Sequence, residues 1–267
     1  MRNWWKLFML AALTVLLAAC GSGLSKEEQA AQLRPDVDAL AGVQRAVNEF
    51  KAETGVLPIK NSEEDTDIFV KYQVDFSKLM PKYLSAIPNN AFEKGGLFQY
   101  VLWDVEGTPT VKLVDLRIPE KIREINIRQM SKDYPQFGEQ ISEFVYHINH
   151  EALGFKQALT VESPYTNNLL PIVYSAEGEV VVDYTIDLQQ FIETEGLTPE
   201  RGTDLRYLIA DANIILPAFS LPYSVDENNE VVFDYDAVAS RAEKIEKYKE
   251  EKAKQEALEQ EQEKENK

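Results

Sequence analysis

Residues 169–184 read LLPIVYSAEGEVVVDY, in which two runs of branched and aromatic side chains flank a short polar segment. The first run covers residues 169–174, the second covers residues 180–184, and Gly178 lies between them. Two such runs joined by a few polar residues with a glycine are typical of a β-hairpin, whose strands run antiparallel. This is the strongest hairpin signal in the chain. We therefore expect an α+β fold in which helices pack on short antiparallel hairpins.

A second hairpin and a helix are predicted nearer the N-terminus. The hairpin joins residues 97–103 to residues 110–116, with Gly107 in the turn. The helix is expected from Pro35 to Glu53, because apolar residues recur there at three- and four-residue spacing. These apolar residues are Leu40, Val43, Val47 and Phe50.

The remaining segments give further expectations for local structure. Residues 68–74 form a β-rich run, residues 119–135 form a charged connector, and residues 204–213 form a helix. Another helix is expected from Ile141 to near Gly154, because Ile141, Phe144, Val145 and Ile148 fit one helical stripe. Asp187 is expected to cap a helix that follows the hairpin of residues 169–184.

Three stretches share a plan of Leu-Pro, a strand, a polar turn, a strand that ends in Tyr, and a nearby Asp that opens a helix. They run from Leu57 to Asp75, from Leu170 to Asp187 and from Leu221 to Asp236. Repeated units of this kind would stack their apolar faces and give two similar subdomains. The alternative is chance, because short strands that end in tyrosine and helices capped by aspartate are both common.

The N-terminus has the three zones of a secretory signal peptide. Basic Arg2 and Lys6 precede an apolar run from Leu7 to Leu17, which is too short for the roughly 20 residues that a membrane-spanning helix needs. The residues Leu17-Ala18-Ala19-Cys20 then resemble the lipobox of bacterial lipoproteins. The resemblance implies that Cys20 receives a diacylglyceryl group with fatty acids such as palmitate, and becomes the mature N-terminus. The alternative is that Cys20 only ends a plain signal peptide.

This resemblance places the protein at the cell membrane, lipid-anchored on the extracytoplasmic face. The expected organisation has five parts. They are a signal peptide (1–19), a lipid-anchored flexible spacer (20–34), a pilin-like α+β subdomain (35–118), a second α+β subdomain (119–239) and a charged tail (240–267). The tail is rich in Glu, Lys, Gln and Ala and cannot bury an apolar face, so we expect it to be partly helical or disordered.

Composition excludes several classes of partner and site. The chain has 28 basic and 45 acidic side chains, a formal net charge of −17, so nucleic acid is not an expected partner. Cys20 is the only cysteine, which excludes a disulfide within the chain and any zinc or iron–sulfur site with several cysteines. The acidic charge also favours repulsion from anionic surfaces.

Candidate catalytic and metal-binding residues are few. His147 and His150 precede Glu151 in the order His-Ile-Asn-His-Glu, which lacks the general base that zincins carry between two histidine ligands. On the predicted helix both histidines would face solvent, so no metal site is expected. The acidic segments 63–67 and 226–230 are expected to be solvated turns, with calcium binding as the alternative. No serine elbow or nucleotide-binding glycine pattern occurs. We therefore expect no cofactor and no enzyme activity.

Two family resemblances concern the folded part. Residues 36–116 resemble the globular half of type IV pilins and type II secretion pseudopilins, through Glu53 to Pro58, Leu84 to Asn89, and the run 98–102. Pilins have a long apolar helix where this chain has the lipobox, so the resemblance implies shape and not filament assembly. The lipobox and the Leu-Pro hairpin blocks together are similar in layout to the YphF-type lipoproteins of monoderm bacteria.

These observations favour a non-enzymatic lipoprotein that acts by protein–protein contacts at the cell surface. The alternative is a solute-binding lipoprotein of an ABC transporter. Against this alternative, the chain lacks the regular strand–helix alternation that would give two doubly wound lobes around a ligand.

Overall fold

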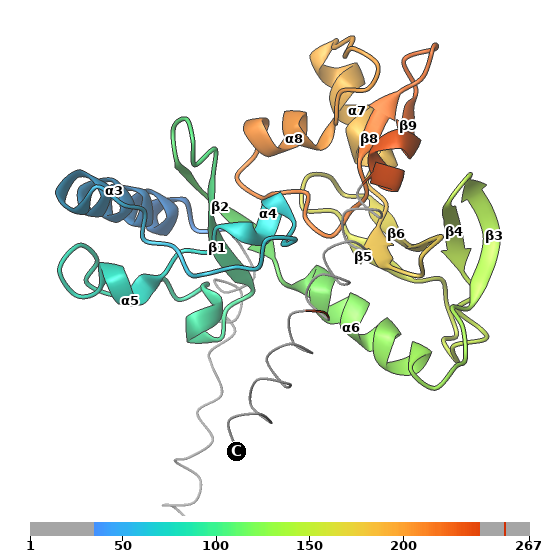
Figure 1. Cartoon of the computed structure of the whole chain (residues 1–267), viewed down its shortest axis with the longest axis horizontal. Coiled ribbons are helices and arrows are strands. Elements are labelled where there is room, and N and C mark those ends of the chain that lie inside the picture. Colours follow the sequence, from blue (N-terminus) through green and yellow to red (C-terminus); the bar gives the residue numbers. More distant parts are fainter. Residues whose placement is uncertain (1–34, 241–253, 255–267) are drawn as a thin grey trace, which may run out of the picture.

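The computed structural model describes residues 35–240 and residue 254 (Figure 1). The predicted signal peptide, Cys20, the spacer and nearly all of the charged tail lie outside these residues. The described chain is a mixed α+β structure with antiparallel hairpins, as expected from the sequence. Within this part of the chain, no helix is both long and apolar enough to cross a membrane.

The first layer consists of helix α3 (Val37–Thr54) packed on the hairpin of strands β1 (Phe98–Trp103) and β2 (Thr110–Asp115). This confirms the predicted helix and hairpin. The side chain of Asp36 accepts a hydrogen bond from the Ala39 amide at 3.0 Å and starts the helix. Gly55 ends it with a φ of 75°, a left-handed conformation that glycine adopts without strain.

Side chains from both partners fill the core between α3 and this hairpin. Val43 and Val47 of the helix are fully buried against the hairpin residues Tyr100 and Leu113. The short helix α5 (Phe76–Leu79) and the 3₁₀ turn η1 (Phe92–Lys94) lie beside them, and Phe76 of α5 packs edge-on against Tyr100.

The second layer is built around strand β6 (Leu169–Ser175), which is the centre of a five-stranded antiparallel sheet. Its pairing with β7 (Val180–Val182) confirms the hairpin predicted from LLPIVYSAEGEVVVDY. Strands β4 (Val145–Ile148) and β5 (Thr160–Glu162) also pair with β6, and β3 (Phe137–Ser142) pairs with β4. Helix α7 (Thr185–Glu195), helix α8 (Arg206–Ala212), and the hairpin of β8 (Tyr223–Val225) and β9 (Val231–Phe233) complete this half.

Two stretches, residues 68–71 and residues 141–148, differ in element type from what the sequence predicts. Residues 68–71 form helix α4 (Ile68–Lys71) instead of a strand, because Asp67 accepts a hydrogen bond from the Phe69 amide and caps a helical turn. The expected helix is replaced over residues 141–148 by parts of β3 and β4. Val145 and Ile148 are buried whereas His147 is exposed, and β4 pairs with β6, a partner that lies more than 20 residues away.

Residues expected to form a charged connector instead form helix α6 (Arg117–Gln129). Pro119 lies in its first turn, where a missing amide hydrogen costs no helical hydrogen bond. Ile118 and Ile125, spaced seven residues apart, are buried in the core of the second layer. The helix therefore forms because its apolar residues match a helical face, which its many charges obscure in the sequence.

The expected cap of α7 is also wrong. Tyr184 holds the N-cap position, and Asp187 lies buried inside the first turn. Its carboxylate accepts hydrogen bonds from the hydroxyls of Ser163 at 2.6 Å and Thr166 at 2.7 Å. Asp187 thus fixes the loop between β5 and β6 to the helix instead of capping the helix.

The repeat of subdomains is not confirmed. The second and third compared stretches each form a hairpin followed by helical residues, namely β6, β7 and α7, and β8, β9 and residues 235–240. The first stretch contains helix α4 at the place where the shared plan requires a strand.

The two layers are joined through strand β2. The backbone of Leu113 donates to the Ile214 carbonyl at 2.8 Å and accepts from the Leu216 amide at 2.9 Å, which forms a parallel bridge. Beside it, the ammonium group of Lys112, buried in mid-strand, donates to the carbonyls of Ala210, Asp211 and Asn213 at the end of α8. Burial lowers the pKa of Lys112, but the carbonyl oxygens at a helix C-terminus favour a cation.

We expect the substitution Lys112→Met to lower the free energy of unfolding by about 1–3 kcal/mol, because it leaves buried carbonyl groups without their donor. Urea denaturation followed by circular dichroism measures this. Lys132→Met, at an exposed position, is the control and should have no measurable effect. If both variants unfold at the same urea concentration, the ammonium of Lys112 does not join the layers.

Candidate interaction site

Helix α6 is the element whose surface is best suited to a contact. Its inner face places Ile118 and Ile125 in the main core, with Ile122 packed partly against it. Residues 117–132 carry five basic and two acidic side chains, in a chain that is strongly acidic as a whole. The helix therefore presents a local excess of positive charge on a firmly packed support.

The first turn of α6 is fixed by a buried carboxylate. Asp115, the last residue of β2, is 2% exposed. It accepts hydrogen bonds from the Arg117 amide at 2.9 Å and from Arg117 Nε at 3.0 Å, and forms an ion pair with Arg117 Nη2 at 2.5 Å. The hydrogen bond to Asp115 raises the pKa of Arg117. Arg117 is thus committed to the start of the helix, with Glu162 3.5 Å away on its outer side.

The middle of the helix carries a second set of ion pairs. Glu124 pairs with Lys121 at 2.7 Å and with Arg128 at 3.4 Å, and the hydrogen bond from Lys121 lowers the pKa of Glu124. Arg128 also donates to the Gly154 carbonyl at 2.9 Å, and its guanidinium lies 3.7 Å from the ring centre of Phe155. Lys121 and Arg128 therefore both have partners within the fold.

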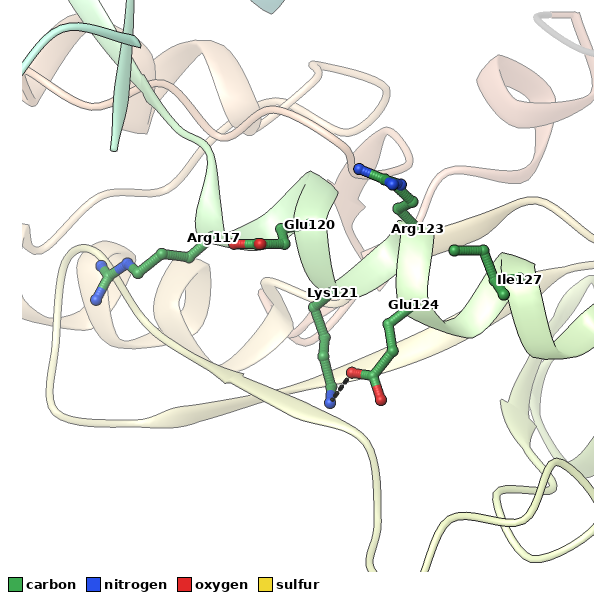
Figure 2. Close-up of a pocket in the computed structure, with 6 residues that line it drawn as sticks. All are labelled: Arg117, Glu120, Lys121, Arg123, Glu124 and Ile127. Carbon is green, nitrogen blue, oxygen red and sulfur yellow. Dashed lines mark hydrogen bonds and ion pairs between the residues drawn. The ribbon is translucent and has the colours of Figure 1, made fainter. Parts of the chain in front are cut away.

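Arg123 differs from these three cations. Among the described residues it has no hydrogen-bond or ion-pair partner, and its side chain is exposed. Figure 2 shows Lys121 and Glu124 extending together on one side of α6, whereas Arg123 extends toward the other side. A hollow of about 500 Å³ lies along α6. It is lined by Arg117, Glu120, Lys121, Arg123, Glu124 and Ile127.

Apolar side chains continue the surface beyond Arg123. Ile127 is 55% exposed, Met130 is 85% exposed and Tyr134 is 69% exposed. Ile127 comes four residues after Arg123, Met130 three residues after Ile127, and Tyr134 four residues after Met130. This spacing keeps Arg123, Ile127 and Met130 on one side of a helix. We call Arg123, Ile127, Met130 and Tyr134 the outer stripe. The outer stripe offers apolar contact area next to Arg123, which has no hydrogen-bond or ion-pair partner among the described residues.

The residues singled out from the sequence lie elsewhere. His147 is exposed on β4 and His150 follows in a turn, so neither is on a helix. Within residues 35–240, no group of three or more His, Cys, Asp or Glu side chains could hold a metal ion. In the acidic segment 226–230, Asp226 accepts hydrogen bonds from the amides of Asn228 at 2.8 Å and Glu230 at 2.9 Å, which closes the β8–β9 turn. Cys20 is outside the described residues.

The sequence predicts a connector at residues 119–135, so the outer stripe is not apparent from the sequence alone. A signal was present, because Ile118, Ile122 and Ile125 have helical spacing, and Ile127 and Met130 have it too. The two sets mark different faces of one helix. Apolar residues on two faces of a helix weaken the single-stripe pattern that marks an amphipathic helix.

One comparison with known proteins gives a match. Residues 36–115 match the YphF family N-terminal domain. This match covers the chain from the cap of α3 to the last residue of β2, so it ends just before α6. It supports the resemblance to YphF-type proteins for this part of the chain, whereas the lipobox and the pilin resemblance stay predictions. No curated protein and no solved structure matches the chain.

We expect Arg123 and Arg128 to differ in their effect on stability. Arg128→Ala should lower the free energy of unfolding by about 1–2 kcal/mol, because it loses a carbonyl hydrogen bond and the contact with Phe155. Arg123→Ala should change it by less than about 0.5 kcal/mol, as expected for an exposed side chain. Thermal unfolding of the two variants beside the parent protein measures both. Equal losses would show that Arg123 has a structural role.

Proposed function

We propose that this protein is a non-enzymatic lipoprotein, anchored through Cys20 on the extracytoplasmic face of the cell membrane, and that it acts through contact with another protein. The observation that carries the contact is the outer stripe of α6. Exposed apolar side chains beside an arginine are typical of the centre of protein interfaces, where arginine and aromatic residues are enriched and lysine is depleted. We expect the partner to offer an apolar surface with an acidic side chain for Arg123.

A protein fits this surface better than an anionic bilayer does. A membrane would attract the arginine but would also meet Glu120 and Glu124 on the same helix, and the chain has a net charge of −17. A protein surface can place one carboxylate opposite Arg123 and avoid the glutamates. Specific placement of charges favours a protein partner over a uniformly charged layer.

The lipid anchor and the contact are compatible in their dimensions. Each buried methylene of an acyl chain contributes about 0.8 kcal/mol, so two or three chains hold a protein firmly at a membrane. Residues 21–34 could extend by up to about 50 Å, because an extended chain gains at most about 3.6 Å per residue. The folded part could therefore reach a membrane protein or a neighbour beside it. A solute-binding role has less support, because the named strands of residues 35–240 pair antiparallel.

The anchor is tested with the variant Cys20→Ser. We expect the parent protein to incorporate a palmitate analogue supplied to cells and to sediment with membranes, and the variant to do neither, because the acylated sulfur is absent. Ser22→Ala is the control and should keep the label. An unmodified parent polypeptide that still begins at Met1, measured by intact mass, would refute the anchor.

The contact is tested with a photo-crosslinking amino acid at Ile127 in living cells. We expect one discrete crosslinked protein, and we expect Arg123→Glu to abolish it because the arginine's charge is reversed. The matched control is the same amino acid at Val56, which is 59% exposed compared with 55% for Ile127.

The crosslinked band should require both the probe at Ile127 and the positive charge of Arg123. The same bands from both positions, bands that persist in Arg123→Glu, or adducts to lipid alone would each contradict a protein contact through the outer stripe.

A further inference from the structure

A second hollow lies where the two layers meet, on a different part of the molecule from the outer stripe. It has a volume of about 530 Å³, within the range of ligand-binding pockets. Its walls come from α4 and the residue after it, from the end of β1 and the following turn, and from α8. Its lining includes the aromatic residues Tyr72, Trp103 and Tyr207 and the acidic residues Asp104, Glu106 and Asp211. We call this hollow the aromatic cleft.

Stacked rings form the floor of the aromatic cleft. The indole of Trp103 lies flat on Phe69, with ring centres 5.2 Å apart and planes 10° apart. Tyr207 of α8 covers both rings, 5.3 Å from Trp103 and 5.6 Å from Phe69. Trp103 is only 7% exposed, whereas Tyr207 is 43% exposed. The floor is therefore rigid, and Tyr207 offers most of the ring surface that an entering group could contact.

Three carboxylates form the rim. Asp211 accepts a hydrogen bond from Trp103 Nε1 at 2.7 Å, and Asp104 accepts one from the Thr108 amide at 2.9 Å, so both have fixed positions. Glu106 lies exposed in the same turn. None of the three forms an ion pair with another described residue. The charge of Asp211 favours the protonated form of Lys112, whose pKa burial lowers, but the Lys112 ammonium donates to three backbone carbonyls and not to a carboxylate.

We propose that the aromatic cleft binds a lysine or arginine side chain from a basic segment of a partner protein. Aromatic rings attract a cation through their electron-rich faces, and the rim carboxylates supply the opposite charge. The apolar stem of such a side chain would lie along Ile68 and Val105, which also line the cleft. This inference depends neither on the lipid anchor nor on the outer stripe.

The expected strength favours a segment over a free amine. A single cation–π contact at a partly exposed site stabilises a complex only weakly, and so does a single exposed ion pair. One ammonium group would therefore bind weakly. A segment with several cations can meet more than one of Asp104, Glu106 and Asp211 at once, so its affinity rises with the number of charges it places.

Trp103 provides a direct readout. The chain has three tryptophans, and Trp4 and Trp5 both precede residue 21, so a protein that begins at Gly21 contains Trp103 alone. This form retains every described residue, and the buried core lies entirely between Val43 and Val238. We expect tetralysine amide to cause a saturable change in its fluorescence, which weakens as salt is added.

The charge requirement is tested with the triple variant Asp104→Asn, Glu106→Gln and Asp211→Asn. Amides keep the shape and the side-chain oxygen that accepts from Trp103 or Thr108, so the fold should melt at the same temperature. We expect tetralysine amide to bind at least about tenfold more weakly. The matched control changes Glu177, Glu195 and Glu200 to Gln, which removes the same charge from exposed positions that do not line the cleft.

The ring requirement is tested with Tyr207→Leu beside Tyr207→Phe. The phenylalanine variant keeps the ring face and should bind nearly as the parent does, whereas the leucine variant should bind several-fold more weakly. Tetraglutamate should not bind to any form.

Three outcomes would overturn the proposal. The first is the absence of a saturable change with tetralysine amide. The second is equal weakening in the cleft variant and its matched control, which would mean attraction by net charge alone. The third is a response to cadaverine, a free amine, at the same concentration and with the same affinity as tetralysine amide, which would assign the cleft to a small amine instead of a protein segment.

Discussion

The structure depends on one buried charge. Lys112 lies in the middle of a strand whose neighbouring residues are buried, and its ammonium is satisfied by carbonyl groups at the end of α8. A buried cation without partners would cost several kcal/mol, so the strand requires the end of a helix at this place. The backbone pairing of Leu113 with residues 214–216 fixes the alignment. The C-terminal half of the chain is held against the first hairpin by these contacts.

Strand β2 also positions both of the surfaces that we assign to binding. At its end, Asp115 holds Arg117 and so sets the direction in which α6 leaves the hairpin. In its middle, Lys112 holds α8, which brings Tyr207 and Asp211 beside Trp103 on the adjacent strand. One surface is basic and apolar, and the other is acidic and aromatic. Strand β2 therefore positions two surfaces of opposite character on one body, through the contact of Lys112 with the distant α8 and the local contact of Asp115 with Arg117.

Elements set by local sequence could be predicted, and elements set by distant partners could not. Helix α3 has a cap, a periodic apolar face and a terminal glycine within its own residues, and the hairpins β1–β2 and β6–β7 pair neighbouring strands. By contrast, β4 has apolar spacing compatible with a helix and becomes a strand because β6 offers an edge. Asp187 has the right type for a cap, yet the hydroxyls of a preceding loop draw it into the interior.

The binding surfaces were hidden for the same reason. In the aromatic cleft, Trp103 comes about a hundred residues before Tyr207 and Asp211 in the sequence. The three residues meet only because α8 packs beside β1. The outer stripe can be recognised only when it is known which arginines of α6 form hydrogen bonds or ion pairs within the fold. Arg117 and Arg128 have partners within the fold, and they would be indistinguishable from Arg123 in the sequence. An exposed charged side chain adds little to stability whether or not it has a partner, so the charge of Arg123 alone does not indicate a binding role. The exposed apolar residues beside it are what indicate an interaction surface.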